Sequence, residues 1–574
     1  MAHLSIIRKT LLYQPDDVMF ARLLRLISDS FNSSSVFSAG RESTQTGEEM
    51  STKSDKGVRR PDEGGITILN DHTIVMAPSS DQDGGTSAKP QKQILLNAFD
   101  MFTVGHLSFG QWRNPKDRAK DKRRDLSYWT DLAKLLDKGG FTSSFAPANI
   151  IIANMAFRYK GSAEPSVRTG AQWPMADPVI PVSAMAAVTK NLGFAITTST
   201  SYEQAYVVAK RFSTLDHLTK GRFGWNIVTS WKESASKAVG LPLVEHDIRY
   251  SNADEYLRVL YKLWEGSWSD TALVEDAEKG IYSDYSQIRP IHHHGKFHVD
   301  APFLTDPSPQ RTPVLFQAGT SPAGIKFGST HAEGIFVAGL SPHVVAPRVK
   351  AIREGAIAAG RDPSSVKVFA MITPIIGKDE EDAKRKYEEA LKYVLIEGGL
   401  AQFSATTGID VSQFDLDHEL TEADVASHLQ RIHSSLYNLR YRGDDVPKLT
   451  PRNLGTVTAI GGNGAMPVGT AAQVADVFQE WVDIADVDGF NIGYVVTPRS
   501  FEDAVEYLVP ELRSRGLLPT ATSEDNPAPT FREQIYGLGQ KGLRSDHPGF
   551  KYKYDTYEET VAKEDAAKAA TAEN

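Results

Sequence analysis

Cysteine is absent from this chain of 574 residues. Disulfides, zinc–thiolate sites, iron–sulfur ligation and cysteine nucleophiles are therefore excluded. Long apolar runs are also absent, because Lys190 interrupts the most apolar stretch at 179–199, so no transmembrane span is expected. The chain has no excess of basic residues either. Its net charge of −9 argues against a dedicated nucleic-acid-binding protein.

The remaining composition is that of an ordinary globular protein, with 41% hydrophobic and 24% charged residues. The lack of cysteine fits an intracellular protein, and we expect a cytoplasmic one. Residues 1–30 combine basic and apolar residues as a mitochondrial transit peptide does, although acidic residues such as Asp16 count against that interpretation. Residues 31–65 and 77–92 are rich in small and polar residues. We therefore predict a disordered or poorly ordered extension over 1–92.

From residue 93 onward, short apolar runs alternate with amphipathic helical patterns. The strand-like runs are 94–99, 192–198, 222–228, 313–318, 334–338, 366–376 and 488–496, with a poorly patterned eighth at 141–147. The helical patterns are 126–138, 178–190, 203–218, 250–264, 321–331, 344–359, 471–484 and 500–514. This alternation predicts parallel strands with crossover helices, and eight such units close a (β/α)8 TIM barrel. A doubly wound open sheet is the alternative, but no G-x-G-x-x-G motif follows the first strand.

The predicted barrel spans residues 93–515, which is longer than the usual size of about 250 residues. Insertions are therefore required, and the turn-rich segments at about 265–312 and 394–465 are the candidates. Residues 516–574 are expected to form a C-terminal tail that packs on the barrel, with its last ~15 residues disordered.

Residues 211–230, RFSTLDHLTKGRFGWNIVTS, are the most informative stretch of the chain. A helical pattern ends at Gly221, and a strand runs from there to Val228. The strand brings polar side chains, including Asn226 and Thr229, to its carboxyl end. A β/α barrel builds its active site from strand ends of this kind.

Several long blocks, in a fixed order, carry a family resemblance. They are LNAFDM (96–101), GHLSFGQWRNP (105–115), MAAVTKNLGFAITTST (185–200), the stretch at 211–230, EHDIRYSNADEYLRVLYKLWEGSW (245–268), PSPQRTPVLFQAGTSPAG (307–324) and DVDGFNIGYVVTP (486–498). Over about residues 93–555, the chain resembles the nitrilotriacetate monooxygenase, pristinamycin synthase and dibenzothiophene-sulfone monooxygenase family of bacterial-luciferase-like flavin monooxygenases.

This resemblance implies an FMN-dependent two-component monooxygenase. A separate flavin reductase, bound transiently, would supply FMNH2, and O2 would then form a flavin C4a-peroxide that inserts one oxygen atom into a small organic substrate. Such a site must be deep and dry, because water destroys the peroxide. Relatives in this family commonly form homodimers. Two alternatives remain: a flavin- or deazaflavin-linked hydride-transfer oxidoreductase, and a degenerate barrel that acts as a binding protein.

The resemblance places flavin contacts at Ser321, His246, Tyr250 and Thr197. Ser321 begins a helix after a strand, where backbone amides can bind the phosphate of FMN, although spacing alone favours an ordinary helix cap. His246 and Tyr250 share one helix face, and Thr197 ends a strand. Without the resemblance, surface packing is the commoner role of a His or Tyr at a helix start, and a β-branched residue in a strand is very common. Asn226 is assigned by position and chemistry, because its amide can pair with the uracil edge of the flavin.

His106 lies in the loop after the first strand and is the catalytic candidate. The resemblance places it near the substrate side of the flavin, where a neutral imidazole can hydrogen-bond the peroxide or move a proton. A histidine that only ties down its own loop is the alternative. Phe109, Trp112 and Trp231 are the expected substrate contacts, and they favour an apolar or aromatic substrate over a polyanion.

Two further features bear on the site. Four histidines cluster at His292, His293, His294 and His298, which suggests a metal site as an alternative. Adjacent histidines on an extended segment point to opposite faces, so we expect no metal there. In the 142–160 segment, Ala148 or Asn149 stands where relatives carry an acidic residue near the flavin. This departure weakens the expectation of flavin binding.

Overall fold

The computed structural model describes residues 91–146, 159–421, 424, 448–462, 464–519 and 529–572. By its internal contacts the chain divides into Met1–Thr86 and Ser87–Asn574, and every described residue belongs to the second unit. The extension predicted at 1–92 therefore lies almost wholly outside the described residues. The same is true of Ala148 and Asn149.

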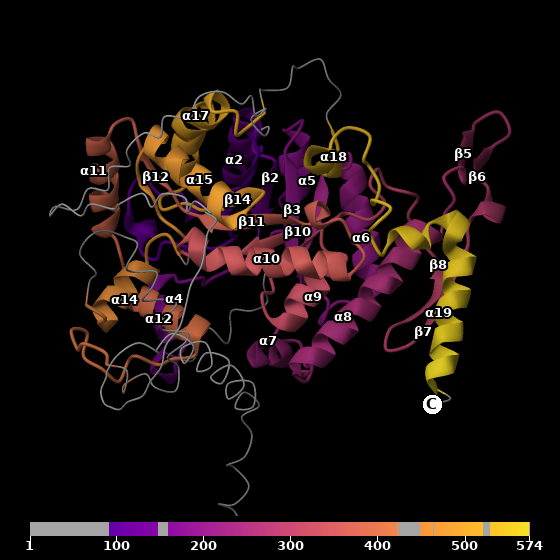
Figure 1. Cartoon of the computed structure of the whole chain (residues 1–574), viewed down its shortest axis with the longest axis horizontal. Coiled ribbons are helices and arrows are strands. Elements are labelled where there is room, and N and C mark those ends of the chain that lie inside the picture. Colours follow the sequence, from indigo (N-terminus) through magenta and orange to yellow (C-terminus); the bar gives the residue numbers. More distant parts are fainter. Residues whose placement is uncertain are drawn as a thin grey trace, which may run out of the picture. The chain divides into compact units, whose positions relative to one another are not determined.

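Eight parallel strands close a barrel in the described part of the chain (Figure 1), which confirms the predicted fold class. They are β1 (Leu95–Phe99), β2 (Ser143–Ala146), β3 (Gly193–Ser199), β4 (Phe223–Val228), β9 (Val314–Gln317), β10 (Gly334–Val337), β11 (Lys367–Ile372) and β14 (Gly489–Ile492). Each strand pairs with the next in this order, and β14 pairs with β1, Leu95 opposite Gly489. Because all strands are parallel, their carboxyl ends meet at one end of the barrel.

Helices surround the strands, and each predicted helical segment contains one. These helices are α2 (Leu126–Gly139), α5 (Val182–Ala187), α6 (Ala205–Leu218), α8 (His246–Tyr261), α9 (Pro322–His331), α10 (Pro342–Ala358), α15 (Ala471–Ala485), and α16 (Arg499–Asp503) with α17 (Val509–Ser514). Local chemistry sets several of their starts: the Asp125 side chain caps α2, and Thr470 and Gln473 form a capping box on α15. α2 buries Trp129 and Leu136 against the barrel core.

Short helices α4 (Glu164–Thr169) and α7 (Glu233–Ala238) lie in loops after β2 and β4. α11 (Glu380–Leu391) is a longer helix that the apolar pattern does not predict. Its buried residues are Ala383 and Ala390, with Tyr387 and Leu391 packed on the same face, so its apolar stripe is narrow and stands among many charged residues. Its capping residue, Asp379, and the acidic first turn were the available signals.

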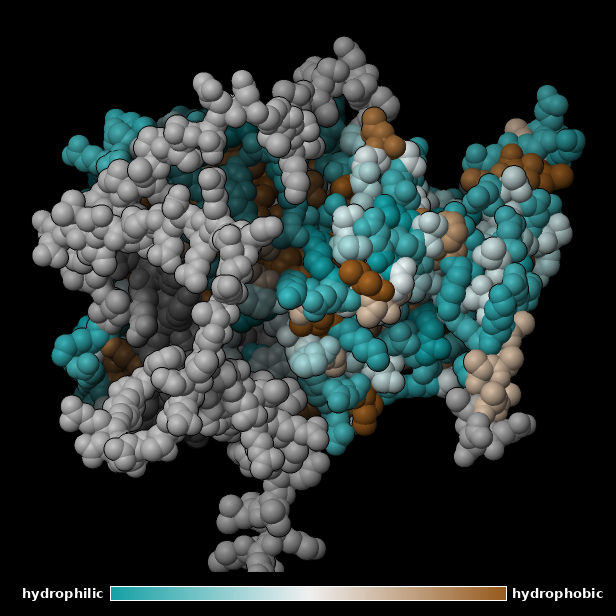
Figure 2. Space-filling model, viewed as in Figure 1, coloured by the Kyte–Doolittle hydropathy of each residue, from teal (hydrophilic) through white to brown (hydrophobic). Residues whose placement is uncertain are grey.

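The two predicted insertions contain small elements of their own. Residues 265–312 form two antiparallel hairpins, β5 (Leu273–Asp276) with β6 (Ile281–Ser283) and β7 (Pro290–His294) with β8 (His298–Pro302). Figure 2 shows apolar surface on the first hairpin, where Val274 and Ile281 are exposed. The 394–465 segment contributes α12 (Ile396–Thr407) and α14 (Pro451–Thr458), which pack together. Outside this segment, β12 (Ile375–Gly377) pairs with β13 (Val468–Thr470).

The C-terminal segment closes the amino-terminal end of the barrel. α18 (Phe531–Tyr536) places the Phe531 ring so close to β3 and β4 that a Cβ atom on Gly193 or Gly224 would lie 2.9 Å from it. Next to this ring, the fully buried Arg532 forms an ion pair with Glu333 at 2.8 Å. Where the sequence predicts a disordered end, the structure has a helix, α19 (Tyr557–Ala572). Ligands must therefore enter from the carboxyl end of the strands.

Candidate active site at the barrel mouth

A cavity of about 420 Å³ opens at the carboxyl ends of the barrel strands. Its walls are mainly apolar and include Phe99, Met101, Leu107, Phe336 and Met371. Nine polar or charged side chains interrupt this apolar lining and could orient a ligand by hydrogen bonds. No helix among the described residues is both long and apolar enough to span a membrane.

His106 lines this cavity and is almost fully buried, at 3% exposure. The ring packs edge-on against Phe99 at 4.7 Å between centroids. Its Nδ1 atom is buried and has no hydrogen-bond partner among the described residues. Burial, reinforced by the charge of Lys122, holds the pKa of His106 well below its ordinary value. The imidazole is therefore neutral at physiological pH.

Thr197 and Asn226 line the cavity from neighbouring strands, β3 and β4, where they are paired in register. Asn226 Nδ2 donates a hydrogen bond to Thr197 Oγ1 at 3.0 Å. The other end of the amide, Oδ1, is buried and has no partner in the described part of the chain. A buried acceptor without a partner is costly, and a ligand N–H group would satisfy it.

Ser321 caps the N-terminus of α9, where its Oγ accepts a hydrogen bond from Gly324 N at 3.1 Å. The same Oγ lies 3.3 Å from Nε2 of His246, which begins α8. The Tyr250 hydroxyl sits against the turn: a Cβ atom on Gly319 would be 2.6 Å from it. Three residues separated by up to 75 positions thus meet at one helix N-terminus, next to the cavity-lining Thr320.

The three aromatic candidates are placed differently. Phe109 is buried and lines the cavity. Trp112 does not line it; its indole donates a hydrogen bond to the carbonyl of Thr169 at 2.9 Å. Trp231 also lies outside the cavity walls and is 53% exposed.

Five polar cavity residues escaped the sequence reasoning: Gln172, Arg348, Gln402, Thr458 and Asn491. Asn491 ends β14 within DGFNIG, so the argument that selected Asn226 could have found it. Arg348 lies inside α10, where no local pattern distinguishes it from a surface arginine. Its guanidinium donates to the carbonyl of Ala338, and it has no carboxylate partner among the residues that the structure describes.

The sequence model of the luciferase-like monooxygenase family matches residues 104–487, about two-thirds of the chain. The chain belongs to this family. The expectation of a luciferase-like monooxygenase is thereby confirmed, and the nitrilotriacetate, pristinamycin and dibenzothiophene-sulfone enzymes are among its relatives. The expected cofactors, FMN and O2, agree with this membership, because the relatives are reduced-flavin-dependent monooxygenases.

Individual relatives cover nearly the whole barrel. Dimethyl-sulfide monooxygenase from Hyphomicrobium sulfonivorans is 42% identical over 480 residues, which is 83% of this chain and 96% of the relative. Long-chain alkane monooxygenase from Geobacillus thermodenitrificans is 40% identical over 467 residues, 80% of this chain and 98% of the relative. A riboflavin lyase crystallised with modified FMN and riboflavin is 35% identical, with a TM-score of 0.70 over 80% of this chain and 100% of that one.

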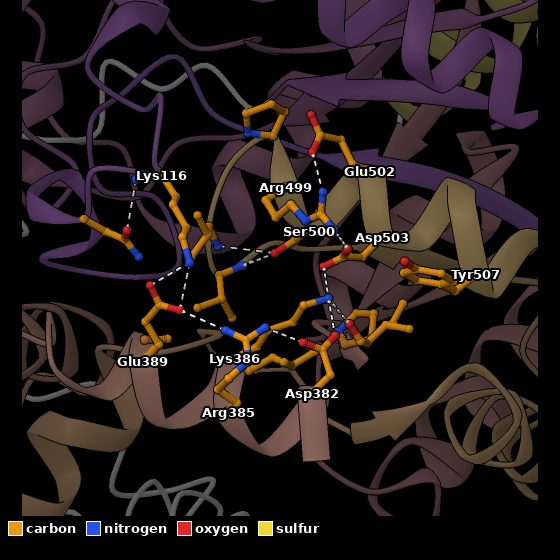
Figure 3. Close-up of a pocket in the computed structure, with 18 of the residues that line it drawn as sticks. Lys116, Asp382, Arg385, Lys386, Glu389, Arg499, Ser500, Glu502, Asp503 and Tyr507 are labelled. Carbon is orange, nitrogen blue, oxygen red and sulfur yellow. Dashed lines mark hydrogen bonds and ion pairs between the residues drawn. The ribbon is translucent and has the colours of Figure 1, made fainter. Parts of the chain in front are cut away.

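The monooxygenase has a second cavity of about 550 Å³, between the start of α11 and the segment around α16 (Figure 3). Ten charged residues line it, and each forms an ion pair. Lys386, for example, lies 2.9 Å from Asp503 and 3.2 Å from Asp382. These pairs join α11 to α16, and two of the cations, Arg118 and Lys378, find their partners, Asp121 and Asp379, outside the lining.

Two histidines of the cluster contact carboxylates of the protein itself. His292 pairs with Asp300 across the β7–β8 hairpin, and His293 lies 3.2 Å from Glu255 of α8. Within the described ranges, no group of three or more His, Cys, Asp or Glu residues has an arrangement that would hold a metal ion.

Proposed function

We propose that the enzyme uses FMNH2 from a separate, transiently bound reductase to transfer one oxygen atom from O2 to a small apolar organic substrate. The observation that carries this proposal is the unpaired acceptor of Asn226 at the bottom of a mostly apolar barrel cavity. The relatives support it: one is named as component A of a two-component system, and two act on dimethyl sulfide and long-chain alkanes. As in relatives, we expect a homodimer.

The residues present fit the flavin. Asn226 Oδ1 is free to accept from a ring N–H, and Thr197 lies beside it. Ser321, His246 and Tyr250 form a cradle at a helix N-terminus that suits the phosphate. We expect Arg348 to bind the same phosphate. It lines the cavity with a positive charge, and no carboxylate among the described residues forms an ion pair with it. When bound, the reduced flavin would supply the electrons that activate O2.

The chain's own residues provide dryness and orientation. The apolar walls around Phe99, Leu107 and Phe336 exclude water from the reacting atoms. His106 is neutral, so it can donate or accept a hydrogen bond without introducing a charge. Phe109 is the substrate contact that the cavity geometry supports. Trp112 and Trp231 are not part of the cavity walls, and we do not include them in the proposal.

Anaerobic titration of the purified protein with FMNH2, followed by rapid mixing with O2, tests the proposal. We expect stoichiometric binding, a transient absorbance change after mixing, and oxygenation of a thioether or alkane substrate. Binding without oxygen consumption would favour a hydride-transfer enzyme. An absence of flavin binding would contradict the proposal and favour a degenerate barrel.

A further inference from the structure

A buried charged network lies behind His106, outside the cavity walls. Lys122, in the 3-10 helix η2 (Asp121–Arg123), has a side chain that is 0% exposed. Its ammonium contacts the carboxylate of Asp100 and lies 2.5 Å from the hydroxyl of Tyr494. Tyr128 of α2 donates to the other oxygen of Asp100 at 2.8 Å. The network thus joins the ends of β1 and β14 through one buried cation.

Tyr494 connects this network to the cavity. The Lys122 ammonium lies 4.2 Å from the centroid of the Tyr494 ring, and that ring lies 5.8 Å from the ring of His106. An ammonium group held this close in a region of low dielectric opposes a second positive charge on the imidazole. Solvent screens the repulsion little, because Lys122, Tyr494 and His106 are all buried.

Two carboxylates oppose this effect in part. Asp100 is bound directly to Lys122 and offsets some of its charge, but the remaining field of the ammonium still lowers the pKa of His106. Burial raises the pKa of Asp117 to about 6, against the backbone hydrogen bonds from Thr497 and Ala119, so this carboxyl group is mostly ionised at pH 7 and loses its charge as the pH falls below 6. Burial also raises the pKa values of Tyr128 and Tyr494 well above their ordinary value, so both stay neutral.

The hydrogen bonds of His106 select its tautomer. A proton on Nδ1 would be buried without an acceptor, because that atom has no partner among the described residues. A proton on Nε2 can be satisfied by a ligand or by water, since the ring lines the cavity. The tautomer that the geometry favours therefore carries its proton on Nε2.

We propose that Lys122 is a positioning residue that keeps His106 a neutral hydrogen-bond donor, with its proton on Nε2 directed into the cavity. The role of this Nε2 donor toward oxygen or the substrate rests on the proposed function. The protonation state of His106 does not rest on it, because it can be measured in the flavin-free protein. A failure of this inference can thus be separated from a failure of flavin binding.

The test is histidine 15N NMR of the flavin-free protein, with the His106 signal assigned by its loss in His106→Gln. We expect wild-type His106 to stay neutral and Nε2-protonated between about pH 5.5 and 8. In Lys122→Gln, which keeps a donor for Asp100 but removes the charge, the pKa of His106 should rise above its wild-type value, although burial, the larger cause of the lowering, remains. Lys386→Gln, in the second cavity, is the matched control and should leave His106 unchanged.

Wild-type His106 that is charged or protonated on Nδ1 at pH 7 would overturn the proposal, and so would an unchanged pKa in Lys122→Gln. Should that variant fail to fold, Lys122→Met combined with Asp100→Asn removes both buried charges and allows the same measurement. In the flavin-loaded enzyme, the kcat profile of Lys122→Gln should gain an acid limb. Activity would fall as pH drops through the raised pKa, because protonation then converts the neutral donor to a cation.

Discussion

The barrel-mouth cavity and the cavity beside α11 differ in how their polar groups are satisfied. The second is the larger, at about 550 Å³ against 420 Å³, yet each of its charged residues already has an ion-pair partner. In the first, Asn226 Oδ1 and His106 Nδ1 have no partner in the described part of the chain, and Arg348 has no counter-ion there. Buried polar groups without a hydrogen-bond or ion-pair partner indicate a binding site, whereas the volume of a cavity alone does not.

The largest expected effect comes from placing a negative charge at the proposed phosphate position. Ser321→Asp should weaken FMNH2 binding by about 100-fold or more, because like charges would be juxtaposed in a poorly screened site. Reduced riboflavin, which lacks the phosphate, is the control ligand and should bind the variant nearly as well as wild type. Equal losses for both flavins, or no loss for FMNH2, would show that the phosphate lies elsewhere.

In the charged cavity, a substitution should affect stability and leave binding unchanged. Lys386→Met removes one of the two cations at each of the mostly buried carboxylates of Asp382 and Asp503, which keep Arg385 and Arg499, and it should lower the free energy of unfolding by roughly 2 kcal/mol. Urea denaturation measures this change, and anaerobic titration should give an unchanged FMNH2 affinity. An altered affinity with unchanged stability would reverse the roles that we assign to the two cavities.

Arg348→Gln removes the unbalanced charge of the barrel-mouth cavity. FMNH2 affinity should fall by about tenfold, the usual contribution of one charge-assisted hydrogen bond, while reduced riboflavin is little affected. Stability should hardly change, since the guanidinium has no ion-pair partner to lose within the described residues. If FMNH2 affinity is retained and the KM for an acidic substrate rises instead, Arg348 binds the substrate.

The smallest effect concerns acid stability. Burial raises the pKa of Asp382, but hydrogen bonds from Arg385 and Lys386 outweigh it and lower the pKa to about 2. A folded-state pKa below the unfolded value stabilises the protein above the unfolded pKa, and this stability is lost as pH falls through about 2. The stability difference between wild type and Asp382→Asn should therefore shrink between about pH 4 and 2. A difference that persists at the acid end would contradict this assignment.

Local pattern was sufficient wherever burial is periodic. Seven of the barrel strands and the helices between them were predictable because their apolar residues recur at strand or helix spacing; the eighth, β2, has a poor pattern and was expected only because a barrel needs eight strands. α11 was missed because its apolar stripe is narrow. Among the site residues, Asn226 and Thr197 could be selected as polar ends of strands. Arg348 and Lys122 could not, because nothing in their helical segments reveals which side faces a cavity or a buried carboxylate.

The sequence by itself determined the alternation of strands and helices, the family and the polar strand ends, because these depend on residue type and spacing along the chain. Tertiary structure alone decided which groups remain without partners. Ser321 meets His246 and Tyr250 only when two barrel loops adjoin, and Lys122 meets both Asp100 and Tyr494 only when β1 and β14 pair in the closed barrel. Hydrogen bonds and buried charges act over a few ångströms in space, so separation along the chain cannot reveal them.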